Sequence, residues 1–184
     1  MKRPFVLVGL TILVGIAVLG VSLVMVAYSG AVNVAASADY LPGARWFFDT
    51  VATHSIAAHA ADASERGELL LPANVTDEQL RTGAEEYRAM CRPCHGTPGG
   101  ARGELGKGMK PHPPDLADSA QEMPIAELAW VIHHGIRHTG MPAFGSTHSP
   151  EDLAAVAAFV ERFDEMTPEE YQRWEGDAAA AHTH

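Results

Sequence analysis

Cysteine is nearly missing from this chain, which carries only Cys91 and Cys94 among its 184 residues. Two cysteines cannot build the disulfide framework of a small secreted scaffold, so they serve one specific site or none. No carboxylate pair, Ser/His/Asp set or phosphate-cradling glycine loop stands out. A composition of 47% hydrophobic and 20% charged residues excludes collagen-like, low-complexity and fully disordered classes of protein.

Basic residues are also scarce. From Ser29 onward, 11 lysines and arginines face 23 acidic residues, which gives this part of the chain a formal charge of −12. Such a surface repels the phosphate backbone of DNA or RNA. We therefore expect no nucleic acid among the partners of this protein.

Charge of either sign is absent from residues 5–28, which read FVLVGLTILVGIAVLGVSLVMVAY. About 20 apolar residues in a helix span a bilayer, so this run is long enough to cross one with some tilt. Lys2 and Arg3 precede it, and the positive-inside rule then keeps residues 1–4 in the cytoplasm and exports the remainder. The sequence predicts one transmembrane anchor over residues 5–28.

The alternative is a signal peptide that is cleaved after Ala36-Ser37-Ala38, which resembles a signal-peptidase site. However, the apolar core of a signal peptide usually has 7–15 residues, and this run is much longer. The site also lies ten residues beyond the end of the run. We therefore favour a retained anchor, and both readings export the rest of the chain.

Residues 29–75 read as a linker, because they contain turn signals and no obvious domain core. Within the linker, residues 44–60 predict an amphipathic helix. Its Trp46, Phe47, Phe48 and Val51 suit a membrane interface or the groove of a partner protein. We favour slightly a third reading, in which this helix packs on the chain's own domain.

An all-α domain with long loops is predicted over residues 76–175, because four segments carry helix-start signals and the stretch 96–123 between the first two shows no strand-like alternation. Thr76 and Gln79 form a capping-box pattern, and Ser149-Pro150 form an N-cap followed by proline. The glycine- and proline-rich stretch 96–123 predicts loops, and residues 176–184 a flexible tail. The expected helices are 77–90, 124–134, 150–163 and a short one after Thr167.

The two cysteines belong to the motif Cys91-Arg92-Pro93-Cys94-His95, which is C-x-x-C-H, the attachment signature of c-type haem. Two thiols at this spacing can add to the two vinyl groups of one porphyrin, and the adjacent imidazole can then bind the iron. The alternatives are a thioredoxin-like redox pair, which needs a βαβ context, and half of a zinc site, which needs a second ligand pair. We favour one covalently bound haem c, with His95 as its proximal ligand.

Met141 is our candidate for the distal ligand. It lies 46 residues after His95, in the loop Thr139-Gly140-Met141-Pro142-Ala143-Phe144-Gly145 before the last main helix. Ligation by His and Met fills both axial positions and raises the reduction potential, as an electron carrier requires. Met90 and Met123 are weaker candidates, and Met109 is expected beside the proximal face. The sharp alternative is bis-histidine ligation through His138.

These features together resemble a class I cytochrome c, specifically the membrane-anchored monohaem c-type cytochromes of proteobacteria. The resemblance covers about residues 76–165. Gly83, Tyr87 and Cys91 are spaced like the family's N-terminal helix, where glycine lets the C-terminal helix cross closely, with Phe159 the expected contact. Pro113-Pro114-Asp115-Leu116 is similar to the family's Pro-Asn-Leu segment. The resemblance implies a hydrogen bond from His95 Nδ1 to the Pro114 carbonyl, while Asp115 departs from the family's Asn.

The resemblance implies a protein that transfers electrons and is not itself an enzyme. It would be a periplasmic one-electron carrier, held by one helix in a bacterial inner membrane and acting in a respiratory-type chain. Its redox partners would be a quinol–cytochrome c oxidoreductase, a dehydrogenase or a terminal oxidase. One alternative is a fixed haem subunit of a larger membrane oxidoreductase complex, and another is a haem-based enzyme or gas sensor with an open sixth position.

Overall fold

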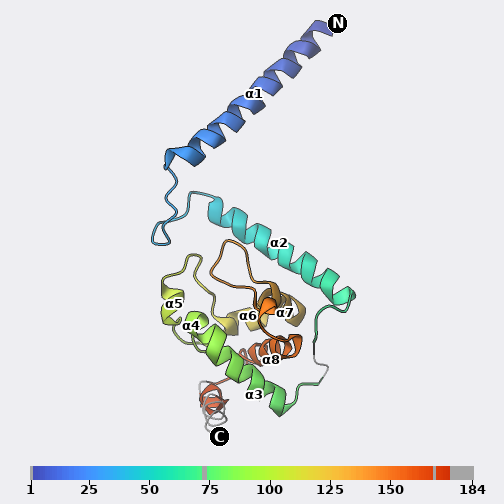
Figure 1. Cartoon of the computed structure of the whole chain (residues 1–184), viewed down its shortest axis with the longest axis vertical. Coiled ribbons are helices and arrows are strands. Elements are labelled where there is room, and N and C mark those ends of the chain that lie inside the picture. Colours follow the sequence, from blue (N-terminus) through green and yellow to red (C-terminus); the bar gives the residue numbers. More distant parts are fainter. Residues whose placement is uncertain (1, 72–73, 168, 175–184) are drawn as a thin grey trace. The chain divides into compact units, whose positions relative to one another are not determined.

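The computed structural model describes residues 2–71, 74–167 and 169–174 of the chain (Figure 1). All regular elements in these ranges are helical and none is a strand, which confirms the predicted all-α class. The chain divides into two units, the first ending at Asp39 and the second beginning at Tyr40. Met1, Pro72 and the predicted tail 176–184 lie outside the described residues.

The first unit consists mainly of helix α1, Lys2–Ser29. Its segment Phe5–Ser29 carries no charged residue, has 25 residues and buries none of them within the protein. At 1.5 Å per residue such a helix is about 37 Å long, enough for a hydrocarbon core of about 30 Å. The predicted apolar segment is therefore a helix that could span a membrane.

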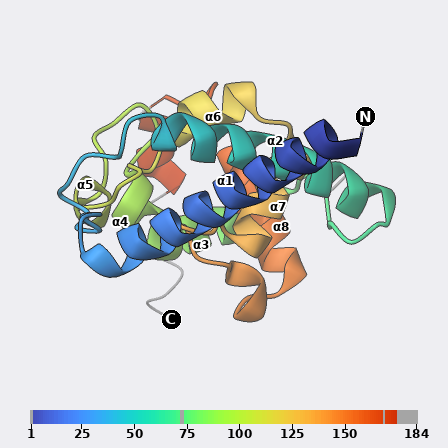
Figure 2. The ribbon, with the colours of Figure 1, turned by 90° about the horizontal axis from the view of Figure 1, so that it is seen from above.

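Helix α2, Ala44–Glu65, opens the second unit. It starts after Gly43, whose φ of 79° ends the preceding turn, and it continues past Ala60 to Glu65. Ile56, Ala60 and Ala63 form its buried stripe, and α2 packs on helix α7, Ile125–His134. The ring of His59 stacks on Trp130 of α7 at 5.9 Å between centroids. Figure 2 shows the ribbon from above, with α2 and α7 labelled.

Helix α3, Asp77–Glu86, begins at the predicted capping box. The Thr76 hydroxyl accepts a hydrogen bond from the Gln79 backbone N–H at 3.2 Å, and the Gln79 side chain accepts from the Thr76 N–H at 3.0 Å. The helical path does not stop at Met90 as predicted. It continues through a π-helical turn, η1 (Tyr87–Cys91), into α4 (Arg92–His95), so one continuous path carries the whole motif. Single π turns within helices often mark functional sites.

Helix α8, Pro150–Val160, crosses α3 at Gly83. A Cβ atom at position 83 would collide with the carbonyl oxygen of Ala155 and lie 2.8 Å from the Phe159 Cβ. Only glycine permits this close approach. Tyr87 meets Phe159 edge to face at 6.0 Å between ring centroids. The predicted crossing of the first and last helices, with Phe159 as the contact, is therefore confirmed.

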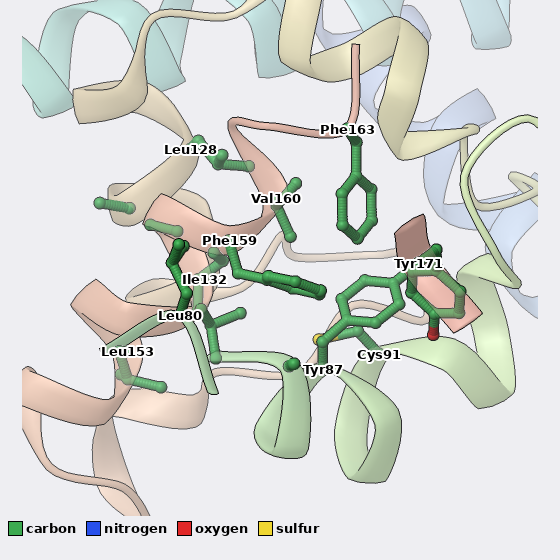
Figure 3. Close-up of a cluster of buried hydrophobic side chains, with 14 residues drawn as sticks. Leu80, Tyr87, Cys91, Leu128, Ile132, Leu153, Phe159, Val160, Phe163 and Tyr171 are labelled. Carbon is green, nitrogen blue, oxygen red and sulfur yellow. The ribbon is translucent and has the colours of Figure 1, made fainter. Parts of the chain in front are cut away.

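The core of the second unit lies around this crossing (Figure 3). Although aromatic residues make up only 7% of the chain, four of them gather here in mostly edge-to-face contacts. They are Tyr87, Phe159, Phe163 and Tyr171, the last from the helical residues 169–174. Aromatic rings in such pairs contribute about 0.5–1.5 kcal/mol each beyond their buried area.

Three short elements lie where the sequence pattern indicated loops: α5 (Glu104–Lys107), α6 (Leu116–Glu122) and η2 (Phe144–Ser146). Each has seven residues or fewer, so none shows the two-turn periodicity by which longer helices are recognised. Pro124 is the N-cap of α7 rather than its first helical residue. These elements close the loops around the site described next.

Candidate functional site

A cavity lies beside the aromatic core, with about 1010 Å³ of empty space, part of it open to solvent. One wall is apolar and comes from α7 and α8. The residues of this wall are Leu128, Val131, Ile132, Val156 and Val160. All three chemically active residues of the predicted motif, Cys91, Cys94 and His95, also line the cavity.

The Cys91 thiol is buried in the cavity wall. Burial raises its pKa to about 12, and the nearby Cys94 and Glu86 act in the same direction. A thioredoxin-like pair needs the opposite, a thiol whose pKa is lowered so that it attacks as thiolate. The electrostatics therefore disfavour the redox-pair alternative.

A zinc site also finds no support in the described part of the chain. No group of three His, Cys, Asp or Glu side chains gathers there in a way that could hold a metal ion. A structural zinc site needs four such ligands in tetrahedral arrangement. The motif instead places two thiols and one imidazole along a largely apolar cavity.

His95 is held by the hydrogen bond that the resemblance implied. Its Nδ1 lies 3.0 Å from the carbonyl oxygen of Pro114. Because a carbonyl can only accept, Nδ1 carries the proton in this contact. Burial lowers the pKa of His95, opposed by the Pro114 hydrogen bond and the charge of Asp115. Burial favours the neutral imidazole, and with the proton on Nδ1 the lone pair of Nε2 is available to a metal.

The segment that carries Pro114 is itself fixed by two side chains. Arg102 Nε donates to the Pro113 carbonyl at 2.9 Å. Asp115 accepts from the Ala117 N–H at 3.0 Å and is the N-cap of α6. This explains the departure from Asn, because either side chain can cap a helix. Neither role was predicted from the sequence, although an acid before Leu116 is a recognisable N-cap signal.

The loop that carries Met141 is tightly closed. In the structure this loop begins before Thr139, at Gly135 directly after α7, where φ is 65° and a Cβ would lie 2.6 Å from the Pro142 carbonyl carbon. The Ile136 N–H donates to the Met141 carbonyl at 3.2 Å, and the Met141 N–H donates to Thr139 Oγ1 at 3.1 Å. Met141 lines the same cavity as His95.

Three further methionines, Met90, Met109 and Met123, line the cavity as well. Met109, whose place beside the proximal face of the haem stays a prediction, lies next to the Met141 loop. Its Sδ is so close to Gly140 that a Cβ on this glycine would lie 2.5 Å from the sulfur. The absence of a side chain at position 140 therefore lets Met109 pack against the loop of the candidate ligand.

The histidines divide between the cavity and the surface around it. His138 adopts a φ of 62°, and its ring lies 6.2 Å from that of Phe48 in α2. It is absent from the residues lining the cavity, whereas His112 is among them. His112 was not singled out from the sequence, and only its position before Pro113-Pro114 could have drawn attention to it. His133, at the end of α7, lies against Gly145.

Residues 78–160 match the family model described as cytochrome C oxidase, cbb3-type, subunit III. This part of the chain is a class I c-type cytochrome domain. The match runs from α3 to α8 and includes the C-x-x-C-H motif, Pro114 and Met141. A search of curated proteins found no matching protein. The cytochrome domain implies haem-based electron transfer with haem c as the cofactor.

The residues around the cavity of the cytochrome domain fit haem c. The porphyrin ring is large and apolar, and the α7 and α8 wall offers aliphatic side chains to cover it. Cys91 and Cys94 offer two thiols on consecutive helical turns, and His95 offers a neutral imidazole whose tautomer is set by Pro114. The donor set therefore fits covalent attachment of haem c and binding of its iron by an imidazole.

Proposed function

We propose that this protein is a one-electron carrier tethered by α1 to the periplasmic face of a bacterial inner membrane, within a respiratory-type chain. Cys91 and Cys94 hold one haem c through thioethers, and His95 and Met141 are its axial ligands. The haem supplies a one-electron couple when bound. The family match, the export signals around α1 and the composition of the cavity wall support this proposal.

The protein's own residues set the properties of that couple. Pro114 orients the His95 ring and strengthens its donation to a metal by accepting the Nδ1–H. The thioether of Met141 is a weak donor that favours the reduced state and so raises the potential. The α7 and α8 side chains exclude water, which penalises additional charge in the cavity. With His95 and Met141 both holding the metal, no position on it would remain for a substrate, and the group would supply electron transfer alone.

The observation that carries the proposal is that His95 and Met141, which lie 46 residues apart in the chain, line one cavity. The test is the absorption spectrum of the purified protein, oxidised and dithionite-reduced, with and without carbon monoxide. We expect the weak far-red band of sulfur-ligated ferric haem and no change of the reduced spectrum with carbon monoxide. A missing band and immediate binding of carbon monoxide would instead indicate an open site for catalysis or gas sensing.

The redox partners proposed are a quinol–cytochrome c oxidoreductase or a dehydrogenase as donor and a terminal oxidase as acceptor. The charge of −12 from Ser29 onward calls for a basic docking face on at least one of them. The rate of electron exchange should therefore fall as ionic strength rises, because salt screens the attraction. A rate that is independent of salt would contradict electrostatic docking.

A second candidate function is a fixed haem subunit of a membrane oxidoreductase complex. The description of the matching family, subunit III of a cbb3-type oxidase, favours it. Extraction of native membranes in mild detergent separates the two candidates. A free carrier migrates alone, whereas a subunit copurifies with stoichiometric companions.

A further inference from the structure

The N-terminal end of α2 exposes a cluster of large apolar side chains. Trp46, Phe47, Phe48 and Val51 are 72%, 54%, 51% and 49% exposed. We call these four residues the aromatic end of α2. Single exposed apolar residues are common, but a contiguous group of them indicates a binding surface. The other half of the helix behaves differently, because its Ile56, Ala60 and Ala63 are buried.

The exposed group continues along the chain toward α1. Leu41 is 57% exposed and Tyr40 is 39% exposed, so apolar surface extends from residue 40 to residue 51. Arg45 is the single basic residue in this stretch, and it pairs with Asp49 at 3.4 Å. The surface therefore offers apolar area and almost no net charge.

The length of the chain limits how far this surface can lie from the membrane. Helix α1 ends at Ser29, and residues 30–43 lead to α2. Fully extended, this connection would reach about 50 Å. Two turns shorten it, closed by hydrogen bonds from Ala38 N–H to Ala35 O and from Ala44 N–H to Leu41 O. A bilayer crossed by α1 is therefore always within reach of the aromatic end.

We propose that the aromatic end of α2 inserts into the interfacial layer of the bilayer that α1 crosses. Tryptophan and phenylalanine favour this layer, where apolar rings leave water at the level of the lipid headgroups. The near absence of basic residues means that anionic lipids add nothing, and the acidic domain is repelled by them. The attraction is apolar, so zwitterionic lipid suffices and salt does not weaken it.

This insertion orients the cytochrome domain. The ring of Phe48 lies 6.2 Å from that of His138, which belongs to the same loop as Met141. Inserting the aromatic end therefore keeps this loop close to the membrane surface. That consequence rests on the proposed function, because it places the electron-transfer site beside membrane partners. The insertion itself depends only on α2.

The test uses the full haem-loaded chain in phosphatidylcholine vesicles, with an environment-sensitive fluorophore on Phe47→Cys and quencher-labelled lipids. The parent chain treated with the same reagent is the control for label taken up by Cys91 and Cys94. The matched control is Glu65→Cys, exposed at the other end of α2 and about 27 Å along the helix. A second control is Leu105→Cys, which is 61% exposed and apolar but lies in α5. We expect lipid quenching at position 47 and none at 65 or 105.

A second variant separates insertion from mere tethering. A label on Val51→Cys should lose its lipid quenching when Trp46→Gln and Phe47→Gln are added, because these changes remove the rings that insert into the bilayer. Both side chains are exposed, so their replacement leaves the fold intact. Unchanged quenching would overturn the proposal, since the tether alone would then set the position. Loss of quenching in 0.5 M salt would overturn its apolar basis.

The competing occupant of this surface is a second copy of the chain or another protein. The label at position 47 could be shielded from water without being quenched by lipid. If that shielding is lost when the protein is diluted in more lipid, a second copy covers the surface and the proposal is overturned. The same sample reports the proposed function separately through its far-red band. A normal band with no lipid quenching refutes insertion alone, and quenching with no band refutes the ligand assignment alone.

Discussion

The Nδ1 atom of His95 lies 3.0 Å from the carbonyl oxygen of Pro114, 19 residues further along the chain. This contact joins the end of the motif helix to a loop that lines the same cavity. The loop is held in turn by Arg102, which donates to the Pro113 carbonyl, and by Asp115, which caps α6. The orientation of the imidazole is therefore set by the tertiary fold before any metal binds.

Replacing the candidate distal ligand should change the haem spectrum, whereas replacing a neighbouring methionine should not. Met141→Ala should abolish the far-red band of the ferric protein and let carbon monoxide bind the reduced form, because a thioether is lost from the iron. Met109→Ala is the matched control, since Met109 lines the same cavity beside Gly140. A band that survives in Met141→Ala and disappears in Met109→Ala would move the ligand assignment to Met109.

The bis-histidine alternative is tested in the same spectrum. His138→Ala should keep the far-red band, because the His138 ring lies against Phe48 and not along the cavity. His112→Ala is the control, since His112 does line the cavity. If the parent protein lacks the band and either variant begins to bind carbon monoxide, that histidine is the sixth ligand.

Adding one methyl group where α3 crosses α8 should destabilise the fold. Gly83→Ala places a Cβ against the Ala155 carbonyl oxygen. Overpacking of this kind costs about 1–3 kcal/mol, which outweighs the gain of about 1 kcal/mol from alanine's helix propensity. The control is Gly108→Ala, whose new Cβ meets only Leu105 O at 3.8 Å. Denaturant titration should show a lower midpoint for Gly83→Ala alone, and equal midpoints would contradict the crossing geometry.

Two buried tyrosines should respond differently to loss of the hydroxyl group. Tyr87 donates to the Gly96 carbonyl at 2.7 Å, so Tyr87→Phe should reduce the free energy of unfolding by about 1–2 kcal/mol. The buried Tyr171 hydroxyl has no hydrogen-bond partner among the described residues, so Tyr171→Phe should be neutral or stabilising. Equal losses in both variants, measured by denaturant titration, would show that Tyr171 has a partner.

The same tyrosines should make the protein sensitive to alkali. Burial raises the pKa of both, that of Tyr171 to about 12. An unfolded tyrosine ionises near pH 10, so above that pH the unfolded state has lost a proton that the folded state retains. Stability therefore falls as the pH rises above about 10. Denaturant titrations at pH 8 and pH 11 should show a smaller loss for Tyr171→Phe than for the parent chain, and an equal loss would contradict the shift.

Several elements could be predicted because their signals are local. The apolar run 5–28 defines α1 by its length, and the capping patterns at Thr76 and Ser149 define the starts of α3 and α8 within one helical turn. The C-x-x-C-H motif is equally local, and it identified the class of domain that the family match then confirmed. In each case the residues that carry the information are neighbours in sequence, so no knowledge of the fold is needed.

Other features depend on contacts between distant segments, and only the tertiary structure decided them. The π turn at Tyr87–Cys91 lies where α3 packs against α8, and the place of Met109 beside Gly140 joins two separate loops. The sequence favoured packing of the 44–60 helix on its own domain, but the choice of α7 as its partner and the exposure of its aromatic end appear in no local pattern. The physical reason is the same each time: packing energy is gained between surfaces that the chain brings together only when it folds, and it overrides local propensity.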